Sequence, residues 1–402
     1  MIVAGAGPGG AAVAAGLAAR EPGLAGKILV VDRERFPRAK PCGGGLTGHA
    51  AEAMAALGLT LRVPSVAAGD GLVRFGRLER RVRLPRPVKI VRREELDASL
   101  VEDVRARGVE VREGVALEDV VVEEGGVTLR VGGERLRARL LVGADGAGSL
   151  VRKRLRGTGT GGARPGTPIR LFRAELPAPP DWRGRSEMLY DFTAMTGGLR
   201  GYVWIFPVPG DRINVGLMHA PGTSLSGAQL SELLRASLAR LGVTLPERAA
   251  RGWPAWGYDA GGPVAGQHLI TVGDAAGIDA LTGEGIAVAL EHAAVAVPQI
   301  LAALAGGDFR FRGYKGALRG ATVGRELALD GRLAWMLYGK QRWRTWLPLV
   351  LFDEEMLGLY AARVAGGLVL ADQRAKLVRA FLGHMLRVGS RRRALSEAAP
   401  PS

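Results

Sequence analysis

The sequence predicts an α/β fold, followed by a mixed, mostly β unit and a C-terminal helical region. A glycine-rich loop at residues 5–10 lies between a short apolar strand and a helix-forming segment, which is typical of a βαβ unit. Between about residues 165 and 260, proline-rich connections separate strand-like runs. Residues 306–402 have helical patterns, and they end in the basic run 391–393 and a tail that we expect to be frayed.

The composition predicts a folded protein from a reducing compartment. The chain has 402 residues, of which 47% are hydrophobic, enough for two or three packed units. Its single cysteine, Cys42, excludes an intramolecular disulfide framework and a cysteine-built metal site, and we expect no metal. No secretory signal pattern precedes the first strand, and no run reaches about 18 apolar residues. We therefore expect a cytoplasmic protein without a transmembrane helix.

The net charge of +16 indicates either a solvated basic surface or an anionic partner. No nucleic-acid recognition module lies among the arginines, so we expect no nucleic-acid partner. An anionic membrane face and a phosphorylated substrate both remain open.

The expected elements follow the chain in order. Strands at 2–4 and 27–31 flank a helix at 11–20, and a glycine- and proline-rich loop at 33–48 precedes a helix at 50–57. Residues 89–107 predict a short strand and a helix that Gly108 ends. Runs at 120–122, 127–131 and 136–140 predict a meander before an apolar strand at 140–142. Later strands are expected at 202–206, 213–218 and 269–272, followed by a long helix at 285–304.

The glycine-rich loop predicts a dinucleotide site. Its sequence is Gly5-Ala6-Gly7-Pro8-Gly9-Gly10, and Asp32 ends the next strand. Bare glycines allow a tight turn and close backbone approach, while the helix N-terminus offers N–H groups to a pyrophosphate. A carboxylate about twenty residues further on accepts hydrogen bonds from ribose hydroxyls. An ordinary glycine-rich turn is the alternative in a chain with 60 glycines, and the loop alone does not separate FAD from NAD.

Distant segments favour FAD. Gly143-Ala144-Asp145-Gly146-Ala147 and Thr271-Val272-Gly273-Asp274-Ala275 each follow an apolar strand, and Leu281-Thr282-Gly283-Glu284-Gly285-Ile286 precedes a helix. With Arg93, these segments resemble the flavin motifs of the para-hydroxybenzoate hydroxylase-like superfamily. The resemblance implies a Rossmann-type FAD-binding domain, with the second aspartate near the ribityl chain and the last turn beside the isoalloxazine ring. For Arg93, a helix-flanking surface position is the alternative.

Two further segments narrow the resemblance. The loop from Asp32 to Leu46, with Pro41-Cys42-Gly43-Gly44-Gly45, strongly resembles the geranylgeranyl reductase family, and so does Tyr202-Val203-Trp204-Ile205-Phe206-Pro207. The chain departs from that family at Ala280, where a proline is usual, and at Met218, where a second glycine follows Gly216. The resemblance adds Arg33, Cys42, Gly43 and Gly44 to the expected flavin site. It also implies that Tyr202, Trp204 and Phe206 line the substrate cavity.

The resemblance implies reduction of an isoprenoid C=C bond, on a geranylgeranyl or polyprenyl chain of a lipid or a diphosphate. Cys42 is then the expected catalytic residue, as proton donor, relay or positioning group. An inert small apolar residue is the alternative for Cys42, and a packed sheet core is the alternative for the three aromatics. No second glycine fingerprint is evident, so NADPH, NADH and ferredoxin all remain open as electron donors.

The motifs divide the chain into three regions. We expect a discontinuous FAD-binding domain of residues 1–75, 89–160 and 264–305, and a substrate domain of residues 76–88 and 161–263. Residues 306–402 form the helical region. There, Arg332, Trp335, Tyr338, Lys340, Arg342, Trp343, Arg344 and Trp346 mix cations with aromatics. Such mixtures suit a peripheral membrane contact, with an ordinary helical surface as the alternative.

An FAD monooxygenase or a flavin-dependent halogenase is the nearest competing hypothesis, because both share the superfamily fold. A halogenase also needs a chloride site and a catalytic lysine, which the sequence does not reveal. A non-catalytic flavoprotein or membrane scaffold is a third class. The sequence leaves the oligomeric state open.

Overall fold

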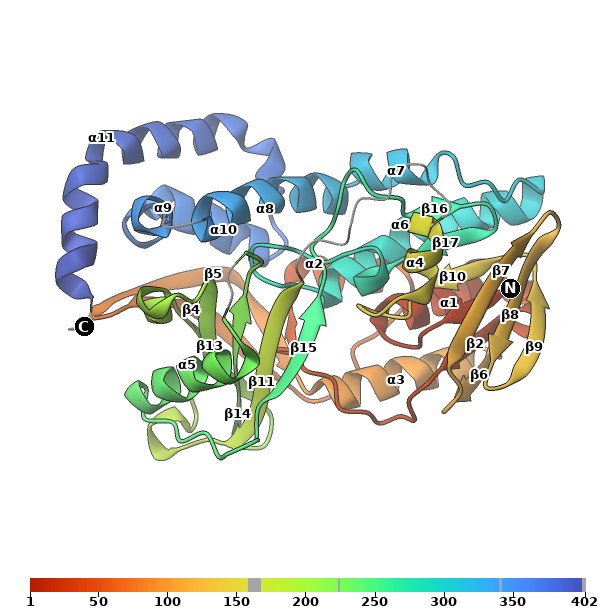
Figure 1. Cartoon of the computed structure of the whole chain (residues 1–402), viewed down its shortest axis with the longest axis horizontal. Coiled ribbons are helices and arrows are strands. Elements are labelled where there is room, and N and C mark those ends of the chain that lie inside the picture. The colour runs from red at the N-terminus through yellow and green to blue at the C-terminus, as the bar shows by residue number, and fades with distance from the viewer. Residues whose placement is uncertain (158–167, 223–224, 340–341, 400–402) are drawn as a thin grey trace.

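The computed structural model describes residues 1–157, 168–222, 225–339 and 342–399. They form an α/β fold with two large sheets and a C-terminal helical region, which confirms the predicted fold class. In Figure 1 the six-stranded sheet lies at the end of the molecule that carries the N-terminus. The eight-stranded sheet lies at the other end, and helices α8 to α11 lie above it in this view.

The six-stranded sheet is parallel except at one edge. Its order is β16-β17-β10-β1-β2-β6, and only β16 is antiparallel among these strands. The strands are β1 (Ile2–Ala4), β2 (Leu29–Asp32), β6 (Glu110–Glu113), β10 (Leu141–Gly143), β16 (Ala265–Gly266) and β17 (Leu269–Thr271). Val3, Val30 and Val142 are fully buried. Central parallel strands are covered on both faces, so they contain continuous apolar runs rather than alternating ones.

Helices cover this sheet. They are α1 (Pro8–Arg20), α2 (Gly48–Ala56), α3 (Arg93–Ala106), α4 (Leu150–Gly157) and α6 (Ile286–Gly306), with a short 3₁₀ helix at Pro22–Lys27. α1 packs against α3 and α6, and α2 packs against α6. Gly16 allows the close packing of α1, because an added Cβ would lie 2.7 Å from Leu57 Cδ2.

α6 is, by length and composition, the one helix among the described residues that could cross a membrane. Most of its most apolar stretch is buried inside the fold, where α1 and α2 pack against it. A core helix passes the same test, so its composition is weak evidence for a membrane span.

The meander predicted from the sequence is present as a three-stranded sheet, which comes after α3 in the chain. β7 (Leu117–Glu123), β8 (Gly126–Val131) and β9 (Glu134–Ala138) pair antiparallel in that order. Val127 and Leu129 are buried, and β9 ends just before the chain enters β10.

The eight-stranded sheet forms the second unit, in the order β15-β11-β14-β13-β12-β4-β5-β3. Its strands are β3 (Gly45–Leu46), β4 (Ser65–Phe75), β5 (Leu78–Val91), β11 (Ile169–Pro177), β12 (Glu187–Asp191), β13 (Gly201–Val208), β14 (Arg212–His219) and β15 (Arg251–Ala255). Helix α5 (Gly227–Arg240) contacts β14. The strands predicted at 202–206 and 213–218 are confirmed as parts of β13 and β14.

The β4–β5 hairpin was missed by the sequence analysis, which placed residues 65–75 with the first unit. β4 pairs with β5 and β12, so these residues belong to the eight-stranded sheet. β5 contains exposed arginines, among them Arg80, Arg81 and Arg83, and they obscure the alternation of apolar residues that marks a strand. The division of the chain into three domains otherwise remains a prediction.

The C-terminal region is helical, as predicted. Its helices are α7 (Tyr314–Gly320), α8 (Thr322–Tyr338), α9 (Trp343–Phe352), α10 (Glu354–Val364) and α11 (Arg374–Ala398). The prediction of a frayed tail is wrong as far as Ala398, because the basic run 391–393 lies inside α11. Arg391 is buried there, with its Nη1 3.1 Å from His384 Nδ1 and its Nη2 3.4 Å from an Asp353 carboxylate oxygen.

The mixed aromatic segment at 332–346 faces inward more than the sequence suggested. Tyr338 is buried. The rings of Trp343 and Phe75 are tilted by 45° with centroids 5.6 Å apart, and the rings of Trp346 and Phe381 meet edge to face with centroids 5.5 Å apart. Trp335 alone among the aromatics of this segment is exposed, while Lys340 lies outside the described residues. The aromatics therefore serve packing in the main, since an interior position removes their large apolar surface from water.

A buried ion-pair cluster joins two of these helices. Arg363 of α10 binds Asp330 of α8 through two parallel bonds of 2.6 and 2.5 Å, and its Nε lies 2.7 Å from Glu326. All three side chains are buried. Such a cluster fixes the helices strongly, because removing one partner leaves an uncompensated charge in the interior.

We expect Arg363→Leu to lower the free energy of unfolding by about 3 kcal/mol, since Asp330 and Glu326 lose their buried partner. Chemical denaturation of the FAD-loaded protein measures this change. Arg379→Leu is the matched control, because Arg379 is exposed where it pairs with Glu355, and it should leave stability unchanged. Equal losses in both variants would contradict the buried role of Arg363.

Candidate active site

A groove runs along the carboxyl ends of the parallel strands, where open α/β sheets bind their ligands. Its wall contains most of the residues expected to hold the dinucleotide: Gly5, Gly7, Pro8, Gly9, Asp32, Arg33, Asp145, Gly146, Gly273 and Asp274. The β1–α1 turn explains the glycines. Gly5 has a φ of +102°, and a Cβ there would lie 2.2 Å from the Ala144 carbonyl oxygen. Gly10 does not line the groove; a Cβ on it would lie 1.9 Å from the Gly5 oxygen, so it tightens the turn.

Asp32 is held rigidly at the end of β2. One carboxylate oxygen accepts a hydrogen bond from the Ala6 amide at 2.7 Å, and the other accepts one from the Glu34 amide at 2.9 Å. This geometry fixes the carboxylate beside the β1–α1 turn, where ribose hydroxyls are expected. Arg33 next to it is exposed at the rim of the groove.

Asp145 and Asp274 approach the groove from two other strand ends. Asp145 Oδ2 accepts from the Leu150 amide at 2.7 Å, whereas its Oδ1 is buried without a partner among the described residues. Burial raises the pKa of Asp145, although hydrogen bonds from Ser149 and the backbone oppose the shift. Asp274 is paired with Lys40 at 2.8 Å. Burial raises the pKa of Asp274, but the charge and hydrogen bond of Lys40, together with the charges of Arg93 and Arg38, outweigh it, and the pKa lies below the usual range.

A cavity continues from the groove past Pro8, Lys40 and Asp274. Its wall brings together the other predicted site residues: Cys42, Gly43, Gly44, Arg93, Tyr202, Trp204, Phe206, Gly283, Gly285 and Ile286. We call it the reaction cavity. Lys40 was not among the predicted site residues, although it stands two residues before Cys42 in the quoted loop.

Arg93 is buried in the wall of the reaction cavity and is not a surface residue. Its Nε and Nη2 each lie 3.0 Å from one oxygen of Asp97, so the pair is bidentate. Burial lowers the pKa of Arg93, but Asp97 and the neighbouring Cys42 raise it above the ordinary value. The guanidinium therefore stays charged beside the cysteine loop.

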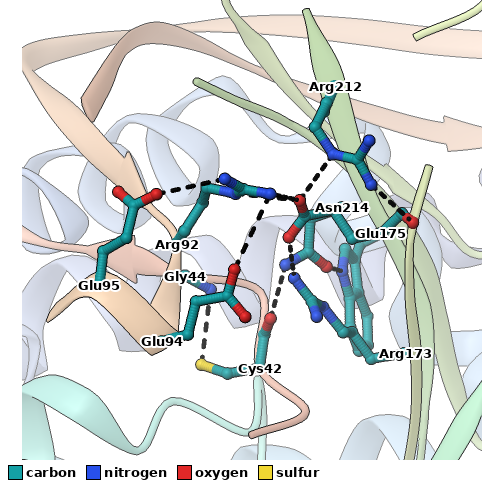
Figure 2. A network of polar contacts seen from close by, with 10 residues as sticks. Cys42, Gly44, Arg92, Glu94, Glu95, Arg173, Glu175, Arg212 and Asn214 are labelled. Atoms are coloured by element: carbon teal, nitrogen blue, oxygen red, sulfur yellow. Dashed lines mark hydrogen bonds and ion pairs between the residues drawn. The ribbon is translucent and has the colours of Figure 1, made fainter. Parts of the chain in front are cut away.

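The Cys42 loop is fastened to the substrate sheet. The Cys42 carbonyl accepts a hydrogen bond from Asn214 Nδ2 at 2.6 Å, and Asn214 Oδ1 accepts from Trp204 Nε1 at 3.0 Å. The Cys42 thiol itself faces the Gly44 amide, 3.4 Å from its nitrogen (Figure 2). Asn214 was missed by the sequence analysis; its position opposite Phe206 in the β13–β14 pair was the available signal.

A cluster of arginines surrounds Glu175 beside this loop (Figure 2). The Glu175 carboxylate accepts bonds of 2.7 Å each from Arg92, Arg173 and Arg212. Burial raises the pKa of Glu175, but these arginines lower it more. Arg92 stands at the start of α3 and the other two on β11 and β14, so the cluster ties the two large units together.

Tyr202, Trp204 and Phe206 form an aromatic wall, as alternation along one strand predicts. All three are buried, with successive ring centroids 6.2 and 6.3 Å apart. Tyr190 on the next strand extends the wall, 5.4 Å from Tyr202. Gly216 makes room for Trp204, because a Cβ there would lie 2.3 Å from the indole.

The glycine turn before α6 closes the cavity. Asp279 caps it by accepting from the Leu281 amide at 2.6 Å and the Thr282 amide at 3.0 Å. The Tyr202 hydroxyl donates to the Thr282 carbonyl, and the Tyr338 hydroxyl donates to the Leu281 carbonyl at 2.7 Å. Side-chain bonds from two other elements therefore hold the turn that contains Ala280.

A second, apolar cavity adjoins the reaction cavity. Both are lined by Met188, Tyr190, Tyr202, Thr282, Tyr360 and Val364. Beyond these, the second cavity is bounded by β4, β5 and the C-terminal helices, through Val73, Leu84, Leu333, Leu349, Met356 and Phe381. We call it the apolar cavity. The sequence analysis assigned no role to these helices in the site.

The residues present fit FAD. The groove offers the free N-terminus of α1 to a pyrophosphate, the Asp32 carboxylate to a ribose, and the unpartnered Asp145 oxygen to a further polar group. The groove opens into the reaction cavity, so one extended dinucleotide with a ring system at its end matches both. Among the described residues no cluster of three or more His, Cys, Asp or Glu is placed to hold a metal ion.

Comparison with known proteins defines the class. Residues 1–308 match the model of the FAD binding domain, and the chain belongs to this family of flavoproteins. The family lies within the para-hydroxybenzoate hydroxylase-like superfamily, so the predicted FAD cofactor and the class of FAD-dependent oxidoreductase are both supported. The individual roles of the site residues stay predictions.

One curated relative spans nearly the whole chain. The menaquinone reductase of Mycobacterium tuberculosis is 31% identical over an alignment of 407 residues, which covers 95% of this chain and 94% of the relative. Two solved structures share the fold. A geranylgeranyl bacteriochlorophyll reductase-like protein from Thermoplasma acidophilum has a TM-score of 0.66 at 17% identity, with 98% of both chains covered. The halogenase PltM has a TM-score of 0.70 at 16% identity, covering 99% of this chain and 94% of its own.

We expect Gly43→Ala to impair turnover without loss of FAD, because the added Cβ would lie 2.9 Å from a ring carbon of Phe206. Gly45→Ala is the matched control in the same loop, since its Cβ would make ordinary contacts at 3.7 Å or more. Steady-state kinetics with flavin absorbance measures both effects. Normal turnover by Gly43→Ala would show that the aromatic wall does not limit the reaction.

Proposed function

We propose that the protein is an FAD-dependent reductase that saturates C=C bonds in the isoprenoid chain of a lipid. The observation that carries this proposal is the apolar cavity that adjoins the reaction cavity. A small polar substrate has no need of such a space. A long hydrocarbon chain gains roughly 0.8 kcal/mol for each buried CH₂ group.

The reaction cavity suits the reduction of an isolated alkene. Such an alkene lacks a carbonyl group to stabilise a carbanion, so hydride transfer is accompanied or preceded by a proton. Bound FAD, once reduced, supplies the hydride. Positive charge that develops on the chain would lie among Tyr190, Tyr202 and Trp204, and aromatic faces stabilise a desolvated cation by about 2 kcal/mol. The burial of this wall also excludes water.

Cys42 is the proposed proton donor, relay or positioning group. Its loop is fixed by Asn214, and its thiol shares the wall of the reaction cavity with Trp204 and Phe206. The charged Arg93 beside it stabilises a thiolate left after proton donation.

The relative named menaquinone reductase supports the substrate class, because menaquinone is a quinone that carries a polyprenyl chain. We propose a prenyl lipid of this kind as the substrate, with a prenyl diphosphate as the second form to test. NADPH or NADH is the proposed electron donor, with ferredoxin as the alternative. The proposed location is the cytoplasm, at the membrane face.

We expect the FAD-loaded protein, reduced by dithionite without oxygen, to add two hydrogens per reduced double bond to a prenylquinone or to geranylgeranyl diphosphate. Mass spectrometry of the extracted lipid measures the gain. In the same assay Cys42→Ala should react at least about tenfold more slowly while retaining FAD. A wild-type rate in this variant would remove the thiol from the mechanism.

The competing activities give different results. A monooxygenase forms a flavin peroxide, so substrate-dependent oxygen consumption without saturation of the chain would replace our proposal. A halogenated product in the presence of chloride would favour the halogenase alternative, whose fold this chain shares with PltM.

We also propose that α11 contacts a membrane. Its exposed face carries Val378, Leu382, Met385 and Leu386 at helical spacing, and Leu386 is 89% exposed. Exposed basic residues flank this stripe, including Lys376, Arg387 and Arg393. An apolar stripe with basic flanks complements an anionic bilayer. Phe381 of the same helix lines the apolar cavity, so a docked α11 would bring a lipid close to it.

We expect Leu382→Asp combined with Leu386→Asp to abolish co-sedimentation with vesicles that contain anionic phospholipid. Val121→Asp is the matched control, because Val121 is also an exposed apolar side chain but lies on β7. Wild-type protein that stays in the supernatant at low salt would refute the contact. So would equal binding by the double variant.

A further inference from the structure

A second group of polar side chains lies between the reaction cavity and another cavity. Thr47 and His49 stand at the start of α2, and Glu284 and Glu291 stand before and within the first turns of α6. Glu284 belongs to the turn expected beside the flavin, but the sequence motifs gave none of the four side chains an individual role.

The inner pair faces the reaction cavity. Thr47 Oγ1 donates a hydrogen bond of 2.7 Å to Glu284 Oε1, and both residues line that cavity. Burial raises the pKa of Glu284. The hydrogen bond from Thr47 and the charge of Arg363 lower it, but by less, so the pKa lies above its ordinary value. A buried acid with a raised pKa can hold a proton beside the site of reduction.

The outer pair faces a cavity on the other side of α2, which we call the outer cavity. His49 Nδ1 lies 3.9 Å from Glu291 Oε1, and both residues line the outer cavity together with Glu52, an exposed residue. The charge of Glu284 in the inner pair acts on Glu291 in the outer pair, so the two pairs are neighbours. Water in the outer cavity can therefore exchange protons with the outer pair.

The surrounding charges favour the protonated form of Glu291. Arg363 is the neighbouring cation, but Asp330 and Glu326 already bind its guanidinium. Burial raises the pKa of Glu291 to about 8, and the nearby Glu284, Glu326 and Glu52 add to the effect against Arg363. Burial and Arg363 lower the pKa of His49 more than Glu52, Glu326 and a backbone hydrogen bond raise it, so His49 is neutral, and a neutral imidazole can take up a proton on one nitrogen while releasing one from the other.

We propose that His49 and Glu291 pass protons from the outer cavity to Glu284 and Thr47, which deliver them to the wall of the reaction cavity. This inference rests on the proposed alkene reduction. That reaction adds a hydride to one carbon and a proton to the other, so one proton must enter the closed cavity for each bond reduced. Glu284 gives up that proton to the reaction cavity and recovers one from Glu291. Glu291 in turn recovers one from the outer cavity through His49, so the charge of the chain is unchanged.

The first test follows the protonation of Glu291 without any turnover. We expect the infrared band of a protonated carboxylic acid to disappear with a midpoint near pH 8 in the FAD-loaded wild type. The transition should be absent in Glu291→Gln. It should persist in Glu52→Gln, with its midpoint shifted slightly to lower pH, because that variant removes one of the charges that raise the pKa of Glu291. A transition that persists in Glu291→Gln would overturn the assignment, whatever the substrate of the enzyme.

The second test follows proton delivery. In the reductase assay we expect wild-type kcat to fall as the pH rises through about 8, because only protonated Glu291 can supply a proton. Glu291→Gln should lower kcat about tenfold with KM unchanged and should remove this limb, while Glu291→Asp should restore part of the rate. An unchanged pH profile in Glu291→Gln would overturn the route but leave the reductase function standing.

Discussion

The turn from residue 279 to residue 283 is the constraint on which the site depends. It connects the end of the flavin-binding sheet to α6, and side chains from two other parts of the chain hold its carbonyl oxygens. Tyr202 reaches it from β13 and Tyr338 reaches it from α8. Each hydroxyl is deeply buried, so leaving either one unpaired would cost more than the bond contributes in water. The turn therefore fixes the aromatic wall and the helical region to the expected flavin position.

The second junction is the Cys42 loop. Asn214 links its backbone to Trp204, and the arginines around Glu175 join α3 to the substrate sheet on the same side. These contacts are charge-assisted or buried, which makes the alignment of the two units rigid. A reaction that needs a thiol, an aromatic wall and a flavin within one small cavity requires such alignment.

The helical region has a part in chemistry as well as in packing. Its helices α8 to α11 complete the apolar cavity, and Arg363 of α10 pairs with Glu326 and Asp330 of α8. One cation shared among several buried carboxyl groups leaves some of them protonated at neutral pH. The same packing that holds the helices in place buries Glu284 and Glu291 and raises their pKa, and the proposed proton route depends on this effect.

The sequence by itself determined the parts whose physics is local. A strand, a bare glycine turn and a helix N-terminus follow each other within ten residues, so Gly5, Gly7 and Gly10 predicted the fold of the first unit correctly. Successive side chains of a strand point to opposite faces, so alternation along β13 also predicted that Tyr202, Trp204 and Phe206 share one face.

Only the tertiary structure decided what depends on distant segments. The exposed arginines of β5 hid the β4–β5 hairpin, since that strand is recognised by its pairing rather than by its composition. Asn214, Lys40 and Glu291 acquire their roles from distant partners. Asn214 binds the carbonyl of Cys42, 172 residues away, Lys40 binds Asp274, 234 residues away, and Glu291 lies beside His49 of another helix. The aromatics of α9 were similarly ambiguous, because the same apolar side chains suit a membrane or a protein core until the packing of the helices is known.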